Sequence, residues 1–293
     1  MDKIEIIASD NLVLKGFYAK AEKPKAVVVI VHGMIEHKER YIPLIEKLNE
    51  NNLTVIICDL RGHGESINEE YFLGRIGSID QMVDDTNRVV EYAKKHNPKL
   101  PIFMFAHSMG SLLGRMYIRQ HAKSIDRLIL SGTVGYKTGC WLGVAAAKLK
   151  SLSNNGKNKY SKLLFIMSND GSSKEEYSWL SYNEENIKNY TSDPLCSFKF
   201  TNYSNYVLFK MTHNLHKHSK KFEFNPDLKI MSISGIDDRT TNGTKGVRDS
   251  IKHLVLDGYD KLTYKEYPNM KHEILMEDDK EKVFDDIVEF FGD

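Results

Sequence analysis

The chain has 293 residues, a length typical of two domains or of one domain that carries an insertion. Lys and Arg number 41 and Asp and Glu 40, so a formal net charge of +1 provides no overall field that would attract a nucleic acid. Apolar residues make up 41% and charged residues 28% of the chain, which is typical of a soluble globular protein and excludes a disordered or rod-like one.

Neither the apolar runs nor the cysteines indicate a membrane or secreted protein. The longest wholly apolar run, residues 26–31, is far shorter than the roughly 20 residues that cross a bilayer. Residues 1–10 contain acids and lack the apolar region of a signal peptide. Cys58, Cys140 and Cys196 form no CxxC pair, which favours reduced thiols. We therefore expect a cytoplasmic protein, either free or peripheral to a membrane.

The β-branched run 26–31 and several other short apolar runs alternate with longer segments whose apolar residues have helical spacing. Ser78 and Gln81 have the spacing of a capping box at the start of one such helix. The alternation predicts an α/β fold, with a mostly parallel central sheet and helices on both of its faces. The predicted strands are 26–31, 54–58, 102–106, 127–131, 228–234 and 262–267, and the apolar stripes of predicted helices cover 79–93, 109–117, 247–255 and 283–291.

The alternation stops between residues 133 and 225, where Asn, Ser, Lys and aromatic residues dominate. We expect a mainly helical lid inserted here, over the C-terminal ends of the strands, with residues 1–132 and 226–293 as the core. Within it, the apolar stretch 141–149 adjoins the Lys-rich segment 148–162. This stretch would line an acyl tunnel, touch an anionic membrane, or pack its apolar face on the core.

The predicted strand at 102–106 runs directly into His107, Ser108 and a helical stripe. Strand, tight turn and helix are the context of a nucleophile elbow, in which small neighbours allow the backbone to turn sharply. Ala106 replaces the first glycine of the usual G-x-S-x-G pattern, and Gly110 keeps the second. Ser108 is therefore the predicted nucleophile, although a serine here could also simply cap the helix.

A serine nucleophile needs a base and an acid, which follow it in the order acid then histidine in this kind of fold. Asp238 lies just beyond the predicted strand 228–234 and is the favoured acid, with Asp237 as the alternative. His272 lies between the predicted strand 262–267 and the last helix and is the favoured base.

The reaction also needs two backbone N–H groups directed at the developing oxyanion. One is predicted from Met109, directly after the nucleophile. The other is predicted from Met34, in a turn shaped by His32 and Gly33 after the strand 26–31.

The motifs together resemble the bacterial type of the monoacylglycerol lipase and lysophospholipase group of serine α/β-hydrolases. The resemblance implies an α/β-hydrolase fold and hydrolysis of a lipid monoester through Ser108, Asp238 and His272. It also implies that Glu36 and His37 order the loop beside the oxyanion hole, although a plain solvated loop is the alternative. The segments that carry the resemblance are 32–41, 58–66, 106–111, 234–239 and 270–277, with 177–198 resembling the lid of bacterial members.

Two other function classes stay open: a short-chain carboxylesterase or aminopeptidase on the same scaffold, and a non-catalytic ligand-binding protein. No nucleotide motif occurs, so no cofactor is expected. His213, His216 and His218 lack Cys or carboxylate partners at ligand spacing, so no metal is expected either. The expected partners are a small lipid ester and, transiently, a membrane surface. Head group, acyl length and oligomeric state stay open.

Overall fold

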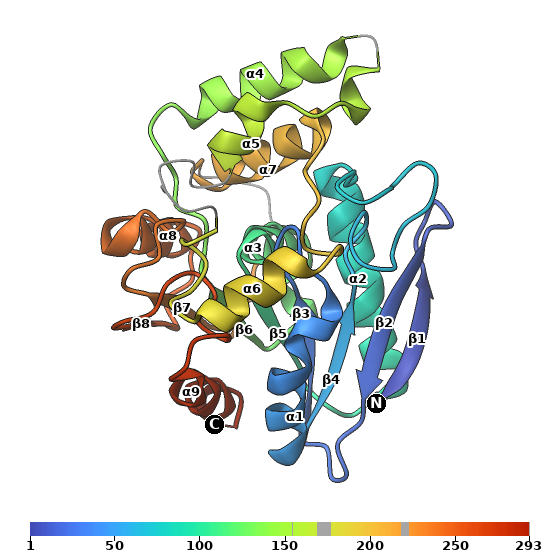
Figure 1. Cartoon of the computed structure of the whole chain (residues 1–293). Helices are drawn as coiled ribbons and strands as arrows, with labels where there is room; N and C mark the ends of the chain where they lie inside the picture. The colour runs from blue at the N-terminus through green and yellow to red at the C-terminus, as the bar shows by residue number, and fades with distance from the viewer. Residues whose placement is uncertain (154, 169–176, 218–222, 293) are drawn as a thin grey trace.

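A computed structural model describes residues 1–153, 155–168, 177–217 and 223–292 (Figure 1). These residues form one eight-stranded sheet in the order β1-β2-β4-β3-β5-β6-β7-β8. In the described ranges, no helix combines the length and the apolarity that crossing a bilayer requires. The strands are β1 (Asp2–Ile7), β2 (Val13–Ala19), β3 (Ala26–Val31), β4 (Leu53–Cys58), β5 (Ile102–His107), β6 (Arg127–Ser131), β7 (Lys229–Gly235) and β8 (Leu262–Tyr267).

Six neighbouring strands of the sheet, β4-β3-β5-β6-β7-β8, run parallel to one another, which confirms the predicted mostly parallel sheet. At the centre, Val29 of β3 pairs with Ile56 of β4 and Met104 of β5. Every residue of β3, β4 and β5 is buried, as expected for strands covered on both faces. The antiparallel β1 and β2 were not predicted, because β1 buries only Ile6 and its sequence DKIEII lacks the continuous apolar run of the central strands.

Helices cover both faces of the sheet (Figure 1). One core layer contains α1 (Ile42–Glu50) and α9 (Lys280–Gly292), which pack on side chains such as Val28 and Phe105. The other layer contains α2 (Ile79–His96), α3 (Met109–His121) and part of α8 (Gly243–Leu256), which pack around Val27 and Met104. The predicted capping box is present at the start of α2, where Ser78 and Gln81 bond each other's backbone N–H groups.

Residues 133–225, called the insertion below, lie between β6 and β7 and contribute α4 (Cys140–Leu152), α5 (Lys162–Ser168), α6 (Glu184–Ser192) and α7 (Asn202–Leu215). In Figure 1, α4, α5 and α7 stack above the sheet, whereas α6 crosses close to the ends of the central strands. The η1 turn (Lys38–Tyr41), the η2 turn (Ala122–Ser124) and the η3 turn (Gly156–Asn158) complete the described elements.

Helix α4 turns its small residues inward and its large apolar residues outward. Gly143 and Ala147 are buried, and a Cβ at Gly143 would lie 3.4 Å from the ring of Phe209 on α7. Trp141 and Leu149 are 56% and 73% exposed. The alternative in which this stretch buries its apolar face on the core is therefore wrong, because close contact between α4 and α7 requires the small side chains on the inner face.

Candidate active site

Ser108 occupies a strained turn between β5 and α3. Its φ of 53° and ψ of −119° lie outside the regions that a serine ordinarily adopts. Its N–H donates to the carbonyl oxygen of Ser131 on β6 at 2.8 Å, which holds the turn against the sheet. Ser108 stands at the N-cap position of α3, but its side chain makes no capping hydrogen bond. The simple helix-cap alternative therefore does not describe this serine.

The turn is possible because its neighbours are small. A Cβ added to Gly110 would lie 2.2 Å from the carbonyl oxygen of Val31, so no larger residue fits there. Ala106 is fully buried, and its Cβ would lie 3.1 Å from a Cβ added to Gly114. The alanine in place of the first motif glycine is therefore accommodated by a glycine on the facing side of α3.

The three predicted polar groups lie within hydrogen-bond distance of one another. His272 Nε2 is 2.8 Å from Ser108 Oγ, and His272 Nδ1 is 2.9 Å from Asp238 Oδ2. All three residues are buried, with exposed fractions of 6%, 2% and 1% for Ser108, His272 and Asp238. The arrangement has the geometry of a nucleophile, a base and an orienting acid.

The structure also separates the two adjacent candidate acids. Asp238 Oδ1 accepts the N–H of Thr240 at 2.7 Å, which directs the other carboxylate oxygen at His272. Asp237 is exposed and accepts the hydroxyl of Tyr182 at 3.1 Å. Only Asp238 meets the histidine.

The charges around His272 match a base that becomes cationic. Burial opposes its protonation, but the Asp238 carboxylate outweighs burial, and the pKa of His272 lies above its usual value. Burial by itself raises the pKa of Asp238. His272 and the Thr240 N–H outweigh burial, so the pKa of Asp238 lies below its usual value and this carboxyl stays ionised. The ring of His107 lies 4.9 Å from that of His272, and burial lowers the pKa of His107 to about 3, which keeps it neutral.

The turn after β3 lies directly against the nucleophile, since a Cβ added to Gly33 would be 3.0 Å from Ser108 Cβ. His32 shapes this turn: its Nδ1 donates to the Gly33 carbonyl oxygen at 2.8 Å, and its Nε2 accepts the Leu60 N–H at 2.7 Å. In the described part of the chain, the N–H groups of Met34 and Met109 have no protein acceptor. Both donors are thus available to a bound oxyanion.

Glu36 and His37 are buried and make specific bonds, so the solvated-loop alternative is wrong. Glu36 Oε1 accepts the Gly33 N–H and the Tyr41 hydroxyl, the latter at 2.9 Å. His37 Nε2 lies 2.8 Å from Asp193 Oδ2, and its Nδ1 bonds Glu39. Burial opposes the charge on His37, but Cys196, Glu39 and Asp193 outweigh it and raise its pKa to about 10. His37 is therefore a cation that ties the loop to the insertion.

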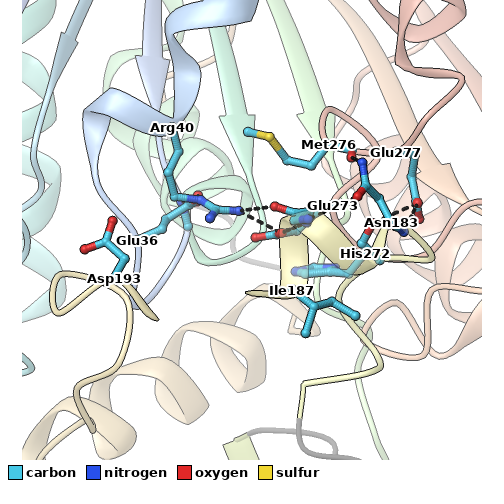
Figure 2. A network of polar contacts seen from close by, with 12 residues as sticks. Glu36, Arg40, Asn183, Ile187, Asp193, His272, Glu273, Met276 and Glu277 are labelled. Atoms are coloured by element: carbon cyan, nitrogen blue, oxygen red, sulfur yellow. Dashed lines mark hydrogen bonds and ion pairs between the residues drawn. The ribbon is translucent and has the colours of Figure 1, made fainter. Parts of the chain in front are cut away.

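Sequence reasoning missed a polar network that joins the insertion to the core beside His272 (Figure 2). Glu273 accepts hydrogen bonds from Arg40 Nη2 and from Asn186 Nδ2 of α6, both at 2.7 Å. Asn183, at the start of α6, donates to the Met276 carbonyl oxygen at 3.1 Å. The sequence contained one indication of this network, because Glu273 directly follows His272, the predicted base.

Residues 178–181, just before α6, are also joined to the core by hydrogen bonds. Ser181 Oγ donates to Glu277 at 2.8 Å, and Lys271 Nζ donates to the Ser178 carbonyl oxygen at 2.6 Å. These bonds place the ring of Trp179 with its centre 5.3 Å from that of His272. The Trp-Leu-Ser segment therefore covers the base directly.

A mostly apolar cavity of about 300 Å³, which Lys137 and several threonines also line, lies between α4, α7 and the loop after β7. Arg239 and Thr240 contribute to its wall, and the Thr240 N–H bonds the Asp238 carboxylate, so the cavity adjoins the acid of the site. Its apolar lining consists of Val134, Cys140, Met167, Leu208 and Phe209.

Of the three clustered histidines in the sequence, His218 lies outside the described residues. His213 stacks near Tyr136 and has no ligand partner among the metal-ligating groups of the described residues. His216 instead approaches Asp249 and His253 of α8.

Residues 22–279 match the model of a family described as serine aminopeptidase, S33. The chain belongs to this family. The structure is similar to that of a thermostable carboxyl esterase from Bacillus coagulans, solved in complex with glycerol. The TM-score is 0.85 and the identity 25%, over 99% of this chain and 97% of that one. The α/β-hydrolase fold expected from the motifs is confirmed.

Two relatives of this S33 family member carry the names of lipid hydrolases. The chain is 34% identical over 113 residues to Phospholipase YtpA of Bacillus subtilis, covering 38% of this chain and 42% of that protein. It is 27% identical over 182 residues to Monoglyceride lipase of Rattus norvegicus, covering 61% of this chain and 55% of that protein. The chain thus spans about half the length of these relatives. The predicted resemblance to monoacylglycerol lipases and lysophospholipases is confirmed.

Proposed function

We propose that this protein hydrolyses the carboxylic ester of a lipid monoester, a monoacylglycerol or a lysophospholipid, through an acyl-enzyme on Ser108. The observation that carries the proposal is the contact of His272 with Ser108 Oγ at 2.8 Å and with Asp238 at 2.9 Å. A binding protein would need neither this contact nor a serine held at a positive φ, which favours an enzyme over a non-catalytic binding protein.

In the proposed first step, Ser108 Oγ attacks the ester carbonyl carbon while His272 Nε2 takes its proton. The carbonyl oxygen becomes an oxyanion and accepts the N–H groups of Met34 and Met109. His272 then donates its proton to the leaving alcohol. Asp238 stabilises the imidazolium throughout without itself taking the proton.

In the second step, His272 deprotonates a water molecule, which attacks the acyl carbon. The tetrahedral intermediate again uses the two N–H groups, and the fatty acid leaves as Ser108 regains its proton. No cofactor takes part in either step of this proposal.

Two observations support a lipid substrate over a short-chain ester. The apolar cavity of about 300 Å³ beside Asp238 has the size and lining of a small ligand pocket, which ranges over about 300–1,000 Å³. The named relatives include a phospholipase and a monoglyceride lipase. The similarity to a carboxyl esterase keeps short-chain esterase activity as the second candidate, and the family description keeps aminopeptidase activity as the third.

The test compares initial rates of wild type and Ser108→Ala on four substrate sets: monoacylglycerols, lysophosphatidylcholines, p-nitrophenyl esters of increasing chain length, and amino-acid p-nitroanilides. We expect medium or long monoesters to be preferred by the wild type. Ser108→Ala should lose at least about 10⁴-fold in rate on every substrate, because the covalent route is gone.

Each other outcome removes a specific part of the proposal. Full activity of Ser108→Ala would show that the nucleophile is wrong. Cleavage of short esters alone would leave the mechanism and remove the lipid substrate. Cleavage of p-nitroanilides with poor ester turnover would make the protein a peptidase.

We also propose that the insertion, residues 133–225, acts as a lid over a core made of residues 1–132 and 226–293. Its Trp179 ring lies beside His272, and α4 and α7 wall the apolar cavity. A lid at this place would control access of the acyl chain to Ser108.

We further propose that the protein works in the cytoplasm and touches an anionic membrane surface transiently through α4 and α5. Trp141, Leu149 and Leu163 are exposed there, at 56%, 73% and 55%. The exposed Lys148 and Lys150 lie among them, and each lysine near an anionic surface contributes about 1 kcal/mol.

Vesicle sedimentation tests this contact with phosphatidylserine-containing and pure phosphatidylcholine vesicles at low salt. The wild type should sediment with the anionic vesicles only. Trp141→Ala with Leu149→Ala should stay in the supernatant while hydrolysing a soluble p-nitrophenyl ester at the wild-type rate. Equal sedimentation of the wild type and the double variant would contradict the proposed surface.

A further inference from the structure

Three side chains with metal-ligating atoms meet where the end of α7 lies against α8, apart from the residues proposed for catalysis. His216 is the C-cap of α7, and Asp249 and His253 lie one turn apart on α8. His216 Nδ1 is 3.3 Å from Asp249 Oδ2, and His253 Nε2 is 3.9 Å from Asp249 Oδ1. The three potential ligand atoms all lie within 4.8 Å of one another.

Two of these distances can be compared with those of a tetrahedral zinc site. Zinc binds histidine nitrogen and carboxylate oxygen at about 2.0–2.2 Å, which places neighbouring ligand atoms of a tetrahedron about 3.3–3.6 Å apart. The pair formed by His216 and Asp249 already has this separation. His253 Nε2 lies 3.9 Å from the other oxygen of Asp249, so binding requires the carboxylate to hold the ion through both oxygens or to turn one oxygen toward both histidines.

A second observation is the state of the His216 ring. Its Nδ1 is buried and makes no hydrogen bond within the described residues, although it faces Asp249. A buried polar atom without a partner is rare and often marks the place of an ion or water. Tyr136 stacks on the same ring, with centroids 3.6 Å apart and planes 3° from parallel, which fixes the direction of that nitrogen.

The space beside the three residues is small. A cavity of about 10 Å³ is lined by Tyr136, His216, Asp249 and His253, and also by Arg115. This is close to the smallest volume that holds one water-sized particle. The side chains of His216 and Asp249 remain 34% and 37% exposed, so an ion could enter and water could complete its coordination.

The charges allow a dication but limit how tightly it binds. Asp249 supplies one negative charge. Arg115 opposes binding, because burial lowers its pKa only to about 10 and it stays cationic at neutral pH.

We propose that His216, Asp249 and His253 bind a first-row transition dication of the zinc class. The ion would have three protein ligands and a water, and it would join α7 of the insertion to α8 of the core. The sequence alone did not indicate this site, because its carboxylate and its second histidine lie more than 30 residues beyond His216 and meet it only after folding.

The test uses the full chain after removal of metal with a chelator. Zn²⁺ is titrated by calorimetry, thermal unfolding is followed with and without Zn²⁺, and the absorption spectrum is recorded with Co²⁺. The variants are Asp249→Asn and His253→Gln, which preserve side-chain size. The matched control is His213→Gln, since His213 lies on the same helix near Tyr136 without a ligand partner among the metal-ligating groups of the described residues.

We expect one equivalent of Zn²⁺ to bind and to raise the unfolding temperature of wild type and His213→Gln. Asp249→Asn and His253→Gln should bind Zn²⁺ at least about tenfold more weakly. Loss of a residue that only orients a metal ligand already lowers metal affinity by about 10–100-fold, and loss of the ligand itself should lower it at least as much. Cobalt should give the visible bands of a tetrahedral site with nitrogen and oxygen ligands.

Two results would overturn the proposal. One is binding of Zn²⁺ by folded Asp249→Asn and His253→Gln as tight as that of the wild type. The other is a near-ultraviolet thiolate band with Co²⁺, which would assign the metal to Cys196 with His37 and Asp193, the other group of possible ligands among the described residues. Circular dichroism of the metal-free variants establishes that they are folded.

Discussion

Adjacent residues in this protein have sharply different surroundings. Asp238 is almost fully buried, accepts a backbone N–H and faces His272, whereas the Asp237 side chain is exposed and accepts a hydrogen bond from the Tyr182 hydroxyl. Both follow the same strand, and either one fits a sequence pattern for the acid. Their different roles depend on which carboxylate the turn after β7 directs inward.

The first prediction is that Asp238→Asn lowers kcat on a soluble p-nitrophenyl ester by about 10⁴-fold. The amide cannot stabilise the imidazolium and favours the wrong tautomer of His272. The measurement is steady-state hydrolysis at a pH above the raised pKa of His272, so that the base is neutral in the wild type.

Asp237→Asn is the matched control and should keep kcat close to that of the wild type. The reverse pattern, with Asp237→Asn inactive and Asp238→Asn active, would show that the geometry of the site has been misassigned.

At the scale of elements, the insertion divides into two parts with different attachments. The segment around α6 is tied to the core through Glu273, Glu277 and Lys271 (Figure 2). Helix α4 instead packs on α7 with small residues and presents Trp141 and Leu149 to solvent. The two parts of the insertion are therefore held by different kinds of contact: polar bonds to the core for α6, and close packing on α7 for α4.

The second prediction concerns the link between Glu273 and Arg40. Glu273→Gln keeps the shape of the side chain but leaves the Arg40 guanidinium, whose side chain is only 10% exposed, short of one counter-charge. We expect the free energy of unfolding to fall by about 3 kcal/mol, since breaking a buried pair costs about 3–5 kcal/mol and Glu36 still lies 3.5 Å from Arg40. Amide exchange in α6 should accelerate at least as much as that in α2, because the buried amides of α2 exchange only through global opening.

The control is Lys282→Met, which removes a pair in which both side chains are 71% exposed. Its cost should stay below about 1 kcal/mol. If Glu273→Gln were as mild as Lys282→Met and α6 exchanged at the wild-type rate, the network would not anchor the insertion.

At the scale of the whole molecule, the two core layers bury several histidines in neutral form near the strand ends. Burial lowers the pKa of His32, His63 and His107, and that of His107 falls to about 3. The unfolded chain protonates these rings near pH 6.5, whereas the folded chain does not. The free energy of unfolding should therefore fall with decreasing pH below about 6.5.

The third prediction is the size of the change in the free energy of unfolding with pH. Between pH 6.5 and 3, the unfolded state binds one more proton than the folded state at His107, which costs about 1.4 kcal/mol per pH unit. His272 adds no slope in this range, because its raised pKa leaves it protonated in both states. Urea unfolding as a function of pH measures the slope.

His107→Gln should unfold with a shallower pH dependence than the wild type, and His96→Gln, which changes an exposed histidine, should match the wild type. Identical slopes for all three proteins would show that His107 is not neutral in the folded state.

The sequence by itself determined the features that depend on neighbours along the chain. The apolar runs of β3 and β5, the capping box of α2 and the elbow at Ser108 are local, because spacing and residue type set the backbone conformation there. The order of nucleophile, acid and base, with the family motifs, was enough to predict Ser108, His272 and the α/β-hydrolase fold, and to narrow the acid to Asp238 or Asp237.

Tertiary structure alone decided which distant groups meet. It paired the polar β1 with β2 at the sheet edge, directed Asp238 rather than Asp237 at His272, and brought Arg40, Asn186 and Glu273 together. It also turned the large apolar residues of α4 outward. Such contacts join residues far apart in the chain, and their energies depend on burial and direction, which no local pattern records.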